Sequence, residues 1–164
     1  MNSPDVVIYT DGSSRGNPGP GGYGIILEDC NSGFIKEYEK GFKLTTNNRM
    51  ELLAVIDALK KLKKEPLKIR VFTDSKYVIN PIEKKWLDNW KKTGFKNKKN
   101  VDLWLEFLPL QEKHNIQFKW IKGHSDHPQN EKCDSLAVGA SKKENLFDDI
   151  GYNNNLNTLF WKRH

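Results

Sequence analysis

The sequence predicts an α/β fold built on a five-stranded mixed sheet with the strand order 3-2-1-4-5, flanked by helices. The apolar, β-branched run at residues 6–10 predicts a buried strand, and the alternating run at residues 67–73 predicts another strand. An amphipathic helix separates them, and a strand–helix–strand crossover makes the two strands parallel neighbours. Two more strand-like runs, at 23–28 and 34–44, precede the helix and predict an antiparallel meander with the first strand.

Turn and capping residues separate these elements. Residues 16–22 are rich in Gly and Pro, which predicts a turn, and residues 31–33 (Asn-Ser-Gly) predict a hairpin. Thr46 or Asn47 can cap the long helix, because a side-chain oxygen there accepts a bond from a free N–H of the first turn. Apolar residues then recur at helical spacing until Pro66 stops the helix.

The second half of the chain is less regular. Residues 75–90 are predicted as a helix that Pro81 breaks, and residues 101–114 as a helix that Pro109 kinks or breaks. A proline inside a helix removes one hydrogen bond and clashes with the preceding turn. A fifth strand follows at residues 116–121.

The ends of the chain and its composition limit the class of protein. A short helix is predicted at 133–143, and an Asn-rich tail follows that we expect to be partly disordered. Lys and Arg number 27 against 21 Asp and Glu, which suits a polyanionic partner, although a Lys-rich solvated surface gives the same balance. No apolar run approaches the roughly 20 residues of a membrane span, no signal peptide is recognisable, and the two cysteines are too few for a disulfide framework. We therefore expect a cytoplasmic protein with no membrane partner.

Four carboxylates are predicted to gather at one edge of the sheet. Asp11 and Asp74 follow the first and fourth strands, and the C-terminal ends of parallel neighbours lie side by side, about 5 Å apart. In α/β sheets this edge binds ligands. Glu51 and Asp134 are each placed in the first turn of a helix from which they can point at the same edge. His124 follows the fifth strand, again at this edge.

Each of these residues has a simpler explanation. Asp11 can start a turn, Asp74 can cap the next helix, and His124 can be an exposed loop residue. Glu51 and Asp134 suit the N-terminal ends of helices. Together these alternatives are weaker, because clustered carboxylates repel one another unless a cation holds them. Oxygen ligands favour a hard cation such as Mg²⁺, with Mn²⁺ as a substitute, and no Cys/His spacing fits zinc.

Four motifs, in this order along residues 6–140, resemble those of bacterial type 1 ribonuclease H. They are YTDGSSRGNPGPGGYG at 9–24, TTNNRMEL at 45–52, TDSKYV at 73–78 and GHSDHPQNEKCD at 123–134. One such motif alone is weak evidence, whereas the ordered set is highly specific. The resemblance implies a ribonuclease H-like catalytic domain at 1–144, with a basic protrusion at about 82–100 and a tail at 145–164.

The resemblance also implies an activity. It predicts an endonuclease that hydrolyses the RNA strand of RNA–DNA hybrids with two Mg²⁺ ions, leaving 5′-phosphate and 3′-hydroxyl ends, and that acts as a monomer. Asp11, Glu51, Asp74 and Asp134 match four catalytic, metal-binding carboxylates. His124 matches a catalytic histidine on a loop, which aids proton transfer or product release.

Residues that match substrate contacts fall into three groups. The first reads the minor groove, the second holds a phosphate or sugar of the DNA strand, and the third belongs to the basic protrusion. The groove-reading group is Asn17, Asn47, Asn48 and Lys76. The group that holds the DNA strand is Thr46, Asn47, Asn89 and Trp86. The group in the protrusion is Trp90, Lys91, Lys92, Lys96, Lys98 and Lys99.

The chain departs from the family pattern without touching the four carboxylates. Lys76 stands where relatives often carry a glutamine that contacts the groove, and Pro81 lies in a segment that is one residue longer. The basic loop at 91–100 is shorter, and Pro109 interrupts a helix that is usually continuous.

Two other interpretations share part of these observations. A DNA transposase or integrase core has a similar fold and acidic cluster, but the chain shows no further module and does carry the basic loop. A non-catalytic module that binds hybrids is expected to lack at least one of the four carboxylates, and all four are present.

Overall fold

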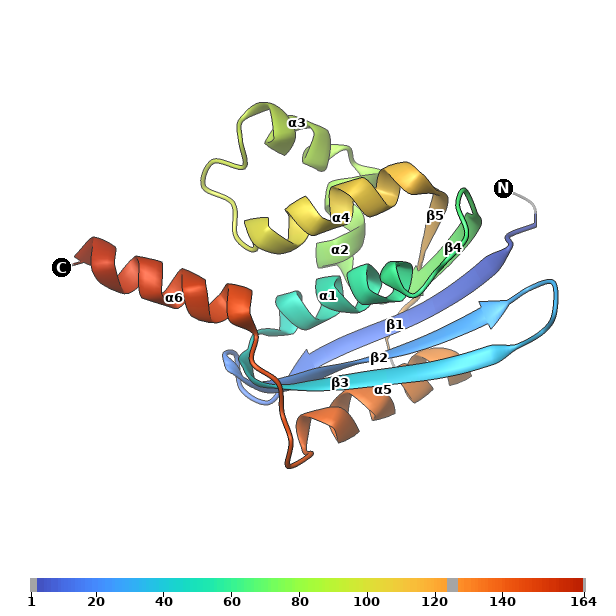
Figure 1. Ribbon diagram of the computed structural model, residues 1–164, viewed down its shortest axis with the longest axis horizontal. Helices are drawn as coiled ribbons and strands as arrows, with labels where there is room; N and C mark the ends of the chain where they lie inside the picture. The colour runs from blue at the N-terminus through green and yellow to red at the C-terminus, as the bar shows by residue number, and fades with distance from the viewer. Residues whose placement is uncertain (1–2, 124–126, 164) are drawn as a thin grey trace.

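The computed structural model describes residues 3–123 and 127–163, with side chains as far as residue 157. Its described part is a five-stranded sheet with helices on both faces (Figure 1). In chain order the elements are β1 (Val6–Ser14), β2 (Gly19–Asp29), β3 (Ile35–Thr45), α1 (Asn47–Lys60), β4 (Lys68–Thr73), α2 (Lys76–Glu83), α3 (Trp86–Lys92), α4 (Val101–Lys113), β5 (Asn115–Trp120), α5 (Pro128–Ser141) and α6 (Ile150–Arg163).

The sheet topology confirms the predicted order, which is β3-β2-β1-β4-β5. β1 and β2 pair antiparallel, and so do β2 and β3, whereas β1–β4 and β4–β5 are parallel. The parallel register of β1 with β4 runs as far as Tyr9 opposite Phe72. Asp11 and Asp74 therefore each stand two residues beyond this last pair, on the same edge of the sheet.

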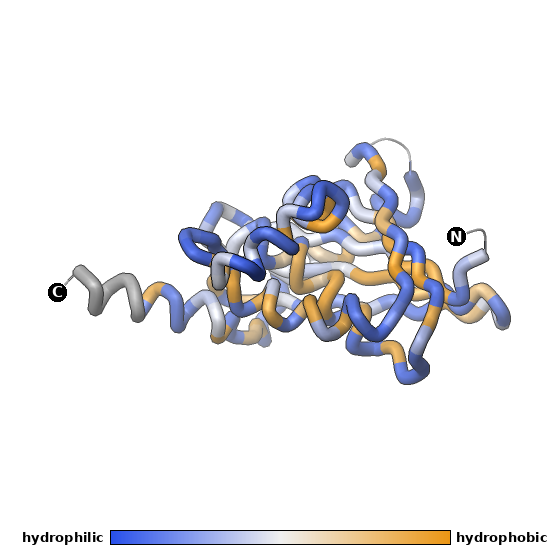
Figure 2. The backbone as a smooth tube through the Cα atoms, turned by 90° about the horizontal axis from the view of Figure 1, so that it is seen from above, coloured by the Kyte–Doolittle hydropathy of each residue, from blue (hydrophilic) through white to orange (hydrophobic). Residues whose placement is uncertain are grey.

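Helices cover the two faces unequally. α1 and α4 lie on one face and α5 lies on the other, against the meander (Figure 1). The predicted apolar face of α1 is buried, with Leu52, Val55, Ile56 and Leu59 at 1% exposure or less. Figure 2 shows the hydrophobic stretches gathered in the body of the molecule, where the sheet and α1 meet. The core thus fixes α1, and with it Glu51, against the centre of the sheet.

Neither proline breaks its helix, so the predicted break at Pro81 is wrong. α2 contains Pro81, and the break in this region comes at Lys85, whose φ is 59°. α4 runs unbroken through Pro109. The carbonyl that loses its partner there belongs to Leu105, which is exposed as Pro109 is, so water can replace the missing donor.

Other elements and positions also differ from the predictions. β1 and β2 extend into the Gly-rich segment, which shortens the predicted turn, because the glycines let neighbouring backbones approach closely. α5 begins at Pro128, capped by His127, so Asp134 lies in its second turn. Glu51 is likewise the fifth residue of α1 and not in the first turn. Much of the tail is helical, as α6, which extends away from the sheet (Figure 1).

Candidate active site

Three of the four predicted carboxylates meet at the edge of the sheet. One oxygen each of Asp11, Glu51 and Asp74 lies within 4.8 Å of the others. Asp11 lies in β1, Asp74 directly follows β4, and Glu51 lies in α1. The convergence predicted from the parallel strand ends is therefore found in the fold.

Gly12 allows β1 and α1 to approach closely at this point. Its N–H donates hydrogen bonds to Oε1 of Glu51 and, at 3.0 Å, to Oδ1 of Asp11. A Cβ atom at this position would overlap the backbone of Met50. Position 12 thus requires a residue without a side chain so that Glu51 can reach the aspartates. The simpler explanation, in which Asp11 starts a turn, did not predict this role of Gly12.

Asp134 stands beside this group on α5. It is half-buried and is not one of the three residues whose oxygens converge. Its charge nevertheless contributes to raising the pKa of Asp11, so Asp134 lies close enough to interact with that carboxylate. α5 comes this close because Gly24 of β2 leaves room for the backbone of Cys133.

Burial and mutual repulsion shift the carboxylates toward their protonated forms. The pKa of Asp11 is raised, first by burial and then by Glu51, Asp74 and Asp134. Burial also raises the pKa of Glu51, and hydrogen bonds from Asp11 and the Gly12 N–H only partly oppose this effect. The repulsion within such a group of carboxylates is relieved either by a retained proton or by a cation.

Without metal, Asp11→Asn is expected to raise the thermal stability. An acid whose pKa is higher in the folded than in the unfolded chain makes folding less favourable as pH rises above about 4. The variant removes this penalty. At pH 8 in EDTA it should gain about 1 kcal/mol or more, which corresponds to about 2–4 °C in Tm. Thermal unfolding from pH 4 to 8 should show the gain shrinking as pH falls. A variant less stable than wild type throughout would contradict this electrostatic account.

The comparison with known sequences identifies the fold. The RNase H family model matches residues 3–142, which is most of the chain. The chain belongs to the ribonuclease H family. A curated ribonuclease H of Nitratidesulfovibrio vulgaris (strain DP4) is 50% identical over 157 residues, covering 93% of this chain and 99% of the relative. The family resemblance and the endoribonuclease class are thereby confirmed.

Solved ribonuclease H structures share the architecture. LC9-RNase H1, described as a type 1 enzyme with the type 2 active-site motif, is 33% identical with a TM-score of 0.75. The match covers 86% of this chain and 74% of LC9-RNase H1. LC11-RNase H1, solved in complex with an RNA/DNA hybrid, is 26% identical with a TM-score of 0.63, covering 82% of this chain and 95% of LC11-RNase H1.

The three predicted groove-reading asparagines of this ribonuclease H lie at an exposed surface near the start of α1, and Lys76 is exposed at the start of α2. The N–H of Asn47 donates to Oδ1 of Asn17 at 3.1 Å, so two of the three asparagines are in direct contact. Asn48 is exposed next to them. Thr46 caps α1 by accepting from the Arg49 N–H at 3.3 Å, which confirms one of the two predicted caps. His124 lies outside the described residues.

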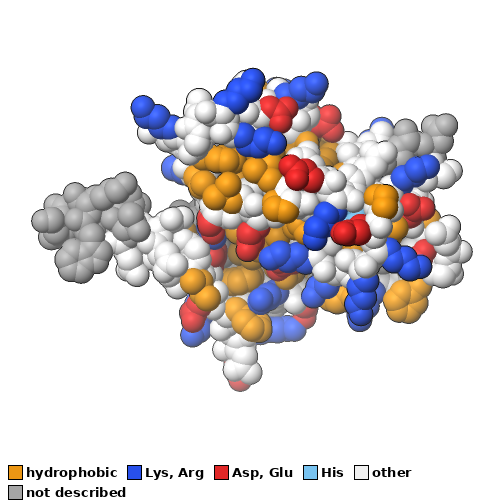
Figure 3. Space-filling view, turned by 45° about the horizontal axis from the view of Figure 1, so that its top comes forward, with side chains coloured by type: hydrophobic (Ala, Val, Ile, Leu, Met, Phe, Trp, Pro, Cys, Tyr) orange, Lys and Arg blue, Asp and Glu red, His pale blue; other side chains and the backbone are white. Residues whose placement is uncertain are grey.

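The predicted basic protrusion, at about 82–100, contains the end of α2, α3 and the loop that follows α3. Figure 3 shows Lys and Arg side chains gathered over this region, at the top of the molecule. Trp86 is 42% exposed and lies under Lys84, whereas Trp90 packs edge-on against the buried Trp104 and belongs partly to the core. Asn89 and Trp90 line a shallow depression there. Its five predicted lysines, all exposed, are Lys91, Lys92, Lys96, Lys98 and Lys99.

Two structural features escaped the sequence analysis. Arg49, which lies between the predicted contacts and Glu51, is buried and paired with Asp102 and Asp149. Trp120 donates its indole N–H to the main-chain carbonyl of Asp74 at 3.0 Å. Arg49 could have been noticed as an arginine directly before the apolar face of its helix, but Trp120 gave no separate signal at the end of its strand.

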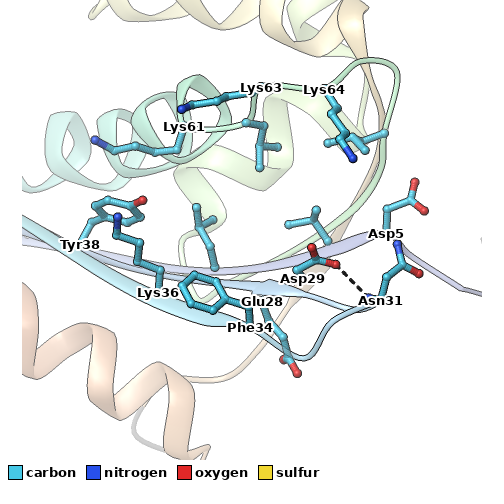
Figure 4. A pocket seen from close by; sticks show the side chains of 14 residues that line it. Asp5, Glu28, Asp29, Asn31, Phe34, Lys36, Tyr38, Lys61, Lys63 and Lys64 are labelled. Carbon is cyan, nitrogen blue, oxygen red and sulfur yellow. Dashed lines mark hydrogen bonds between the residues drawn. The ribbon is translucent and has the colours of Figure 1, made fainter.

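A depression of about 280 Å³ lies elsewhere, between the C-terminal end of α1 and the hairpin that joins β2 and β3 (Figure 4). Its lining combines lysines with carboxylates. Because it adjoins Asp5 and Val6 at the start of β1, it is at the opposite end of the strand from Asp11. It is not part of the site.

Within the described residues, no helix combines the length and apolar character needed to cross a membrane.

Proposed function

We propose that this ribonuclease H cleaves the RNA strand of RNA–DNA hybrids with divalent cations held by Asp11, Glu51, Asp74 and Asp134. The observation that carries the proposal is the convergence of three buried or half-buried carboxylates within 4.8 Å. The hybrid complex of LC11-RNase H1, a structural neighbour, supports the substrate. Action as a monomer in the cytoplasm stays a prediction.

The residues present fit a hard divalent cation. All four side chains offer oxygen, burial lowers the local dielectric constant, and the raised pKa of Asp11 marks charge that a cation would neutralise. If these carboxylates held two Mg²⁺ ions, the ions would supply activation of the attacking water and stabilisation of the leaving 3′ oxygen, which would give 5′-phosphate and 3′-hydroxyl ends. Mn²⁺, with a similar preference for oxygen, is expected to substitute.

The protein itself supplies position and strand selection. The Gly12 N–H orients Glu51 through the hydrogen bond described above. Asn17, Asn47 and Asn48 can donate to and accept from the 2′-hydroxyls that distinguish RNA from DNA. We assign His124 to proton transfer or product release.

Other side chains are assigned to the DNA strand and the groove. Thr46, Asn47 and Asn89 are assigned to a phosphate of the DNA strand, Trp86 to its sugar, and Lys76 to the groove. Exposure of Trp86 and Lys76 supports these contacts.

Digestion of a hybrid labelled on its RNA strand tests the proposal. Cleavage is expected with Mg²⁺ or Mn²⁺, none is expected in EDTA, and duplex DNA of the same sequence should remain intact. End analysis of the products should find 5′-phosphates. Cleavage of duplex DNA, or cleavage of the hybrid in EDTA, would refute the proposed substrate or the metal requirement.

Replacing Lys91, Lys92, Lys96 and Lys98 with alanine is expected to weaken hybrid binding while kcat changes little. Each lost phosphate contact should flatten the plot of log K against log salt by about one unit or slightly less. Binding and steady-state kinetics across a salt series measure both effects.

A matched control removes the same number of charges far from the site. It replaces Lys36, Lys61, Lys63 and Lys64, which line the depression at the other end of the sheet (Figure 4), with alanine. This control separates a local contact from the change in net charge. An equal salt slope in the two quadruple variants would show that the protrusion does not contact the substrate.

A further inference from the structure

Trp120 ends the edge strand β5 directly beside Asp74. The ladder between β4 and β5 reaches Thr73 opposite Trp120, and the Ile121 N–H donates to the Thr73 carbonyl at 3.0 Å. There β4 ends, and Ser75 caps α2. Asp74 therefore lies between a strand and a helix, in the first position where the regular ladder no longer holds the backbone.

At this position the indole N–H of Trp120 supplies a hydrogen bond that the strand ladder no longer provides. It donates to the main-chain carbonyl of Asp74 at 3.0 Å. The carbonyl before the Asp74 Cα atom, that of Thr73, is held by Ile121, and the one after it is held by Trp120. Because both flanking peptide groups are fixed, the direction in which the Asp74 side chain leaves the backbone is fixed as well.

Two neighbours reinforce this arrangement. The Lys76 ammonium lies 4.6 Å from the centre of the Trp120 ring, so α2 contacts one face of an indole that remains 47% exposed. Gly123, three residues after Trp120, leaves room for the Asp74 carboxylate, since a Cβ atom there would lie 2.7 Å from Oδ2. One side chain thus connects the end of β5, the start of α2 and a carboxylate of the site.

We propose that Trp120 is a positioning residue that orients Asp74 for metal binding through the hydrogen bond to its main-chain carbonyl. The proposal rests on the function proposed above, in which Asp74 is a ligand. It predicts that loss of the indole N–H lowers the affinity for the metal but not the affinity for the hybrid, because no substrate contact is removed.

Trp120→Phe tests the proposal. Mg²⁺ binding to the free protein is measured by calorimetry, and kcat and KM are measured across a Mg²⁺ series. Loss of support behind a metal ligand typically costs 10–100-fold in affinity or activity, so we expect about a 10-fold weaker Mg²⁺ affinity and a similar fall in kcat. KM for the hybrid should stay within about twofold at saturating Mg²⁺.

Two further variants keep the test sharp. Benzothienylalanine at position 120 preserves the ring but replaces the N–H by sulfur, and should reproduce the weaker Mg²⁺ affinity. Trp104→Phe is the matched control, since the Trp104 N–H is buried without a hydrogen-bond partner in the described structure. It should lower Tm and leave the Mg²⁺ affinity unchanged.

The outcomes separate cleanly. Wild-type Mg²⁺ affinity in both position-120 variants, or a rise in KM alone, would overturn the positioning role. If wild type neither binds Mg²⁺ nor cleaves the hybrid, the proposed function fails and the positioning role fails with it. If wild type does both and the two variants match it, only the positioning role is lost.

Discussion

Asp74→Asn is expected to reduce cleavage of the hybrid at least about 100-fold while hybrid binding stays within a few-fold of wild type. Asparagine keeps the shape of the side chain and most of its hydrogen-bonding capacity, but it removes one negative charge from the group that Asp11 and Glu51 complete. In a buried site the missing charge is poorly replaced by water, so a divalent cation is held less tightly.

Single-turnover cleavage and equilibrium binding of a labelled hybrid measure the two effects separately. Asp148→Asn is a suitable control, because Asp148 is exposed and its ion pair with Lys43 spans 3.6 Å. This control should behave as wild type in both assays. Cleavage by Asp74→Asn within a few-fold of wild type would remove Asp74 from the set of ligands.

Arg49→Met is expected to lower the free energy of unfolding by about 3–5 kcal/mol. The Arg49 side chain is 2% exposed, and it donates to Asp149 at 2.7 and 2.9 Å and to Asp102 at 2.8 and 2.7 Å. Asp149 is itself 5% exposed, so the substitution leaves a buried carboxylate without its counter-charge. The loss corresponds to a fall in Tm of about 10 °C for a chain of this size.

Chemical denaturation of wild type and variants measures this loss. The double variant Arg49→Met/Asp149→Leu should recover a large part of the stability, since an apolar pair can replace a buried ion pair. Lys43→Met, which removes the exposed pair with Asp148, should change the stability by less than about 1 kcal/mol. If Arg49→Met lowered the free energy of unfolding as little as Lys43→Met does, water would already be stabilising the charge of Asp149.

The sequence was sufficient for the sheet and for most of the site because those features rest on local patterns. Alternating and β-branched runs give strands, and a strand–helix–strand crossover places Asp11 and Asp74 at one edge whatever the remaining contacts are. Both were found where predicted. The helix positions of Glu51 and Asp134 were one turn out, because both helices begin earlier than their first apolar residues.

The features that could not be predicted depend on contacts between distant segments. Pro109 lies inside α4, where both it and Leu105, whose carbonyl loses its donor, are exposed residues, and a sequence does not show which side of a helix faces solvent. The bond from Trp120 to Asp74 joins residues 46 positions apart and has no local pattern. Pairing of Arg49 with Asp149 requires that the segment before α6 returns to β3, where Asp149 also accepts from Thr45 at 2.7 Å.

The pairing of Arg49 with Asp149 also bears on how the protein folds as it is synthesised. Arg49 lies beside the predicted groove-reading asparagines, yet its buried partner is the residue 100 positions later. On the ribosome, α1 emerges long before Asp149, so until then the Arg49 guanidinium can pair only with the less buried Asp102, which lies 53 positions later. Contacts of such long sequence separation form late and slowly. The nascent body is therefore expected to assemble around β1–β4 first, and the end of α1 that carries these asparagines is expected to become rigid only after Asp149 has left the exit tunnel.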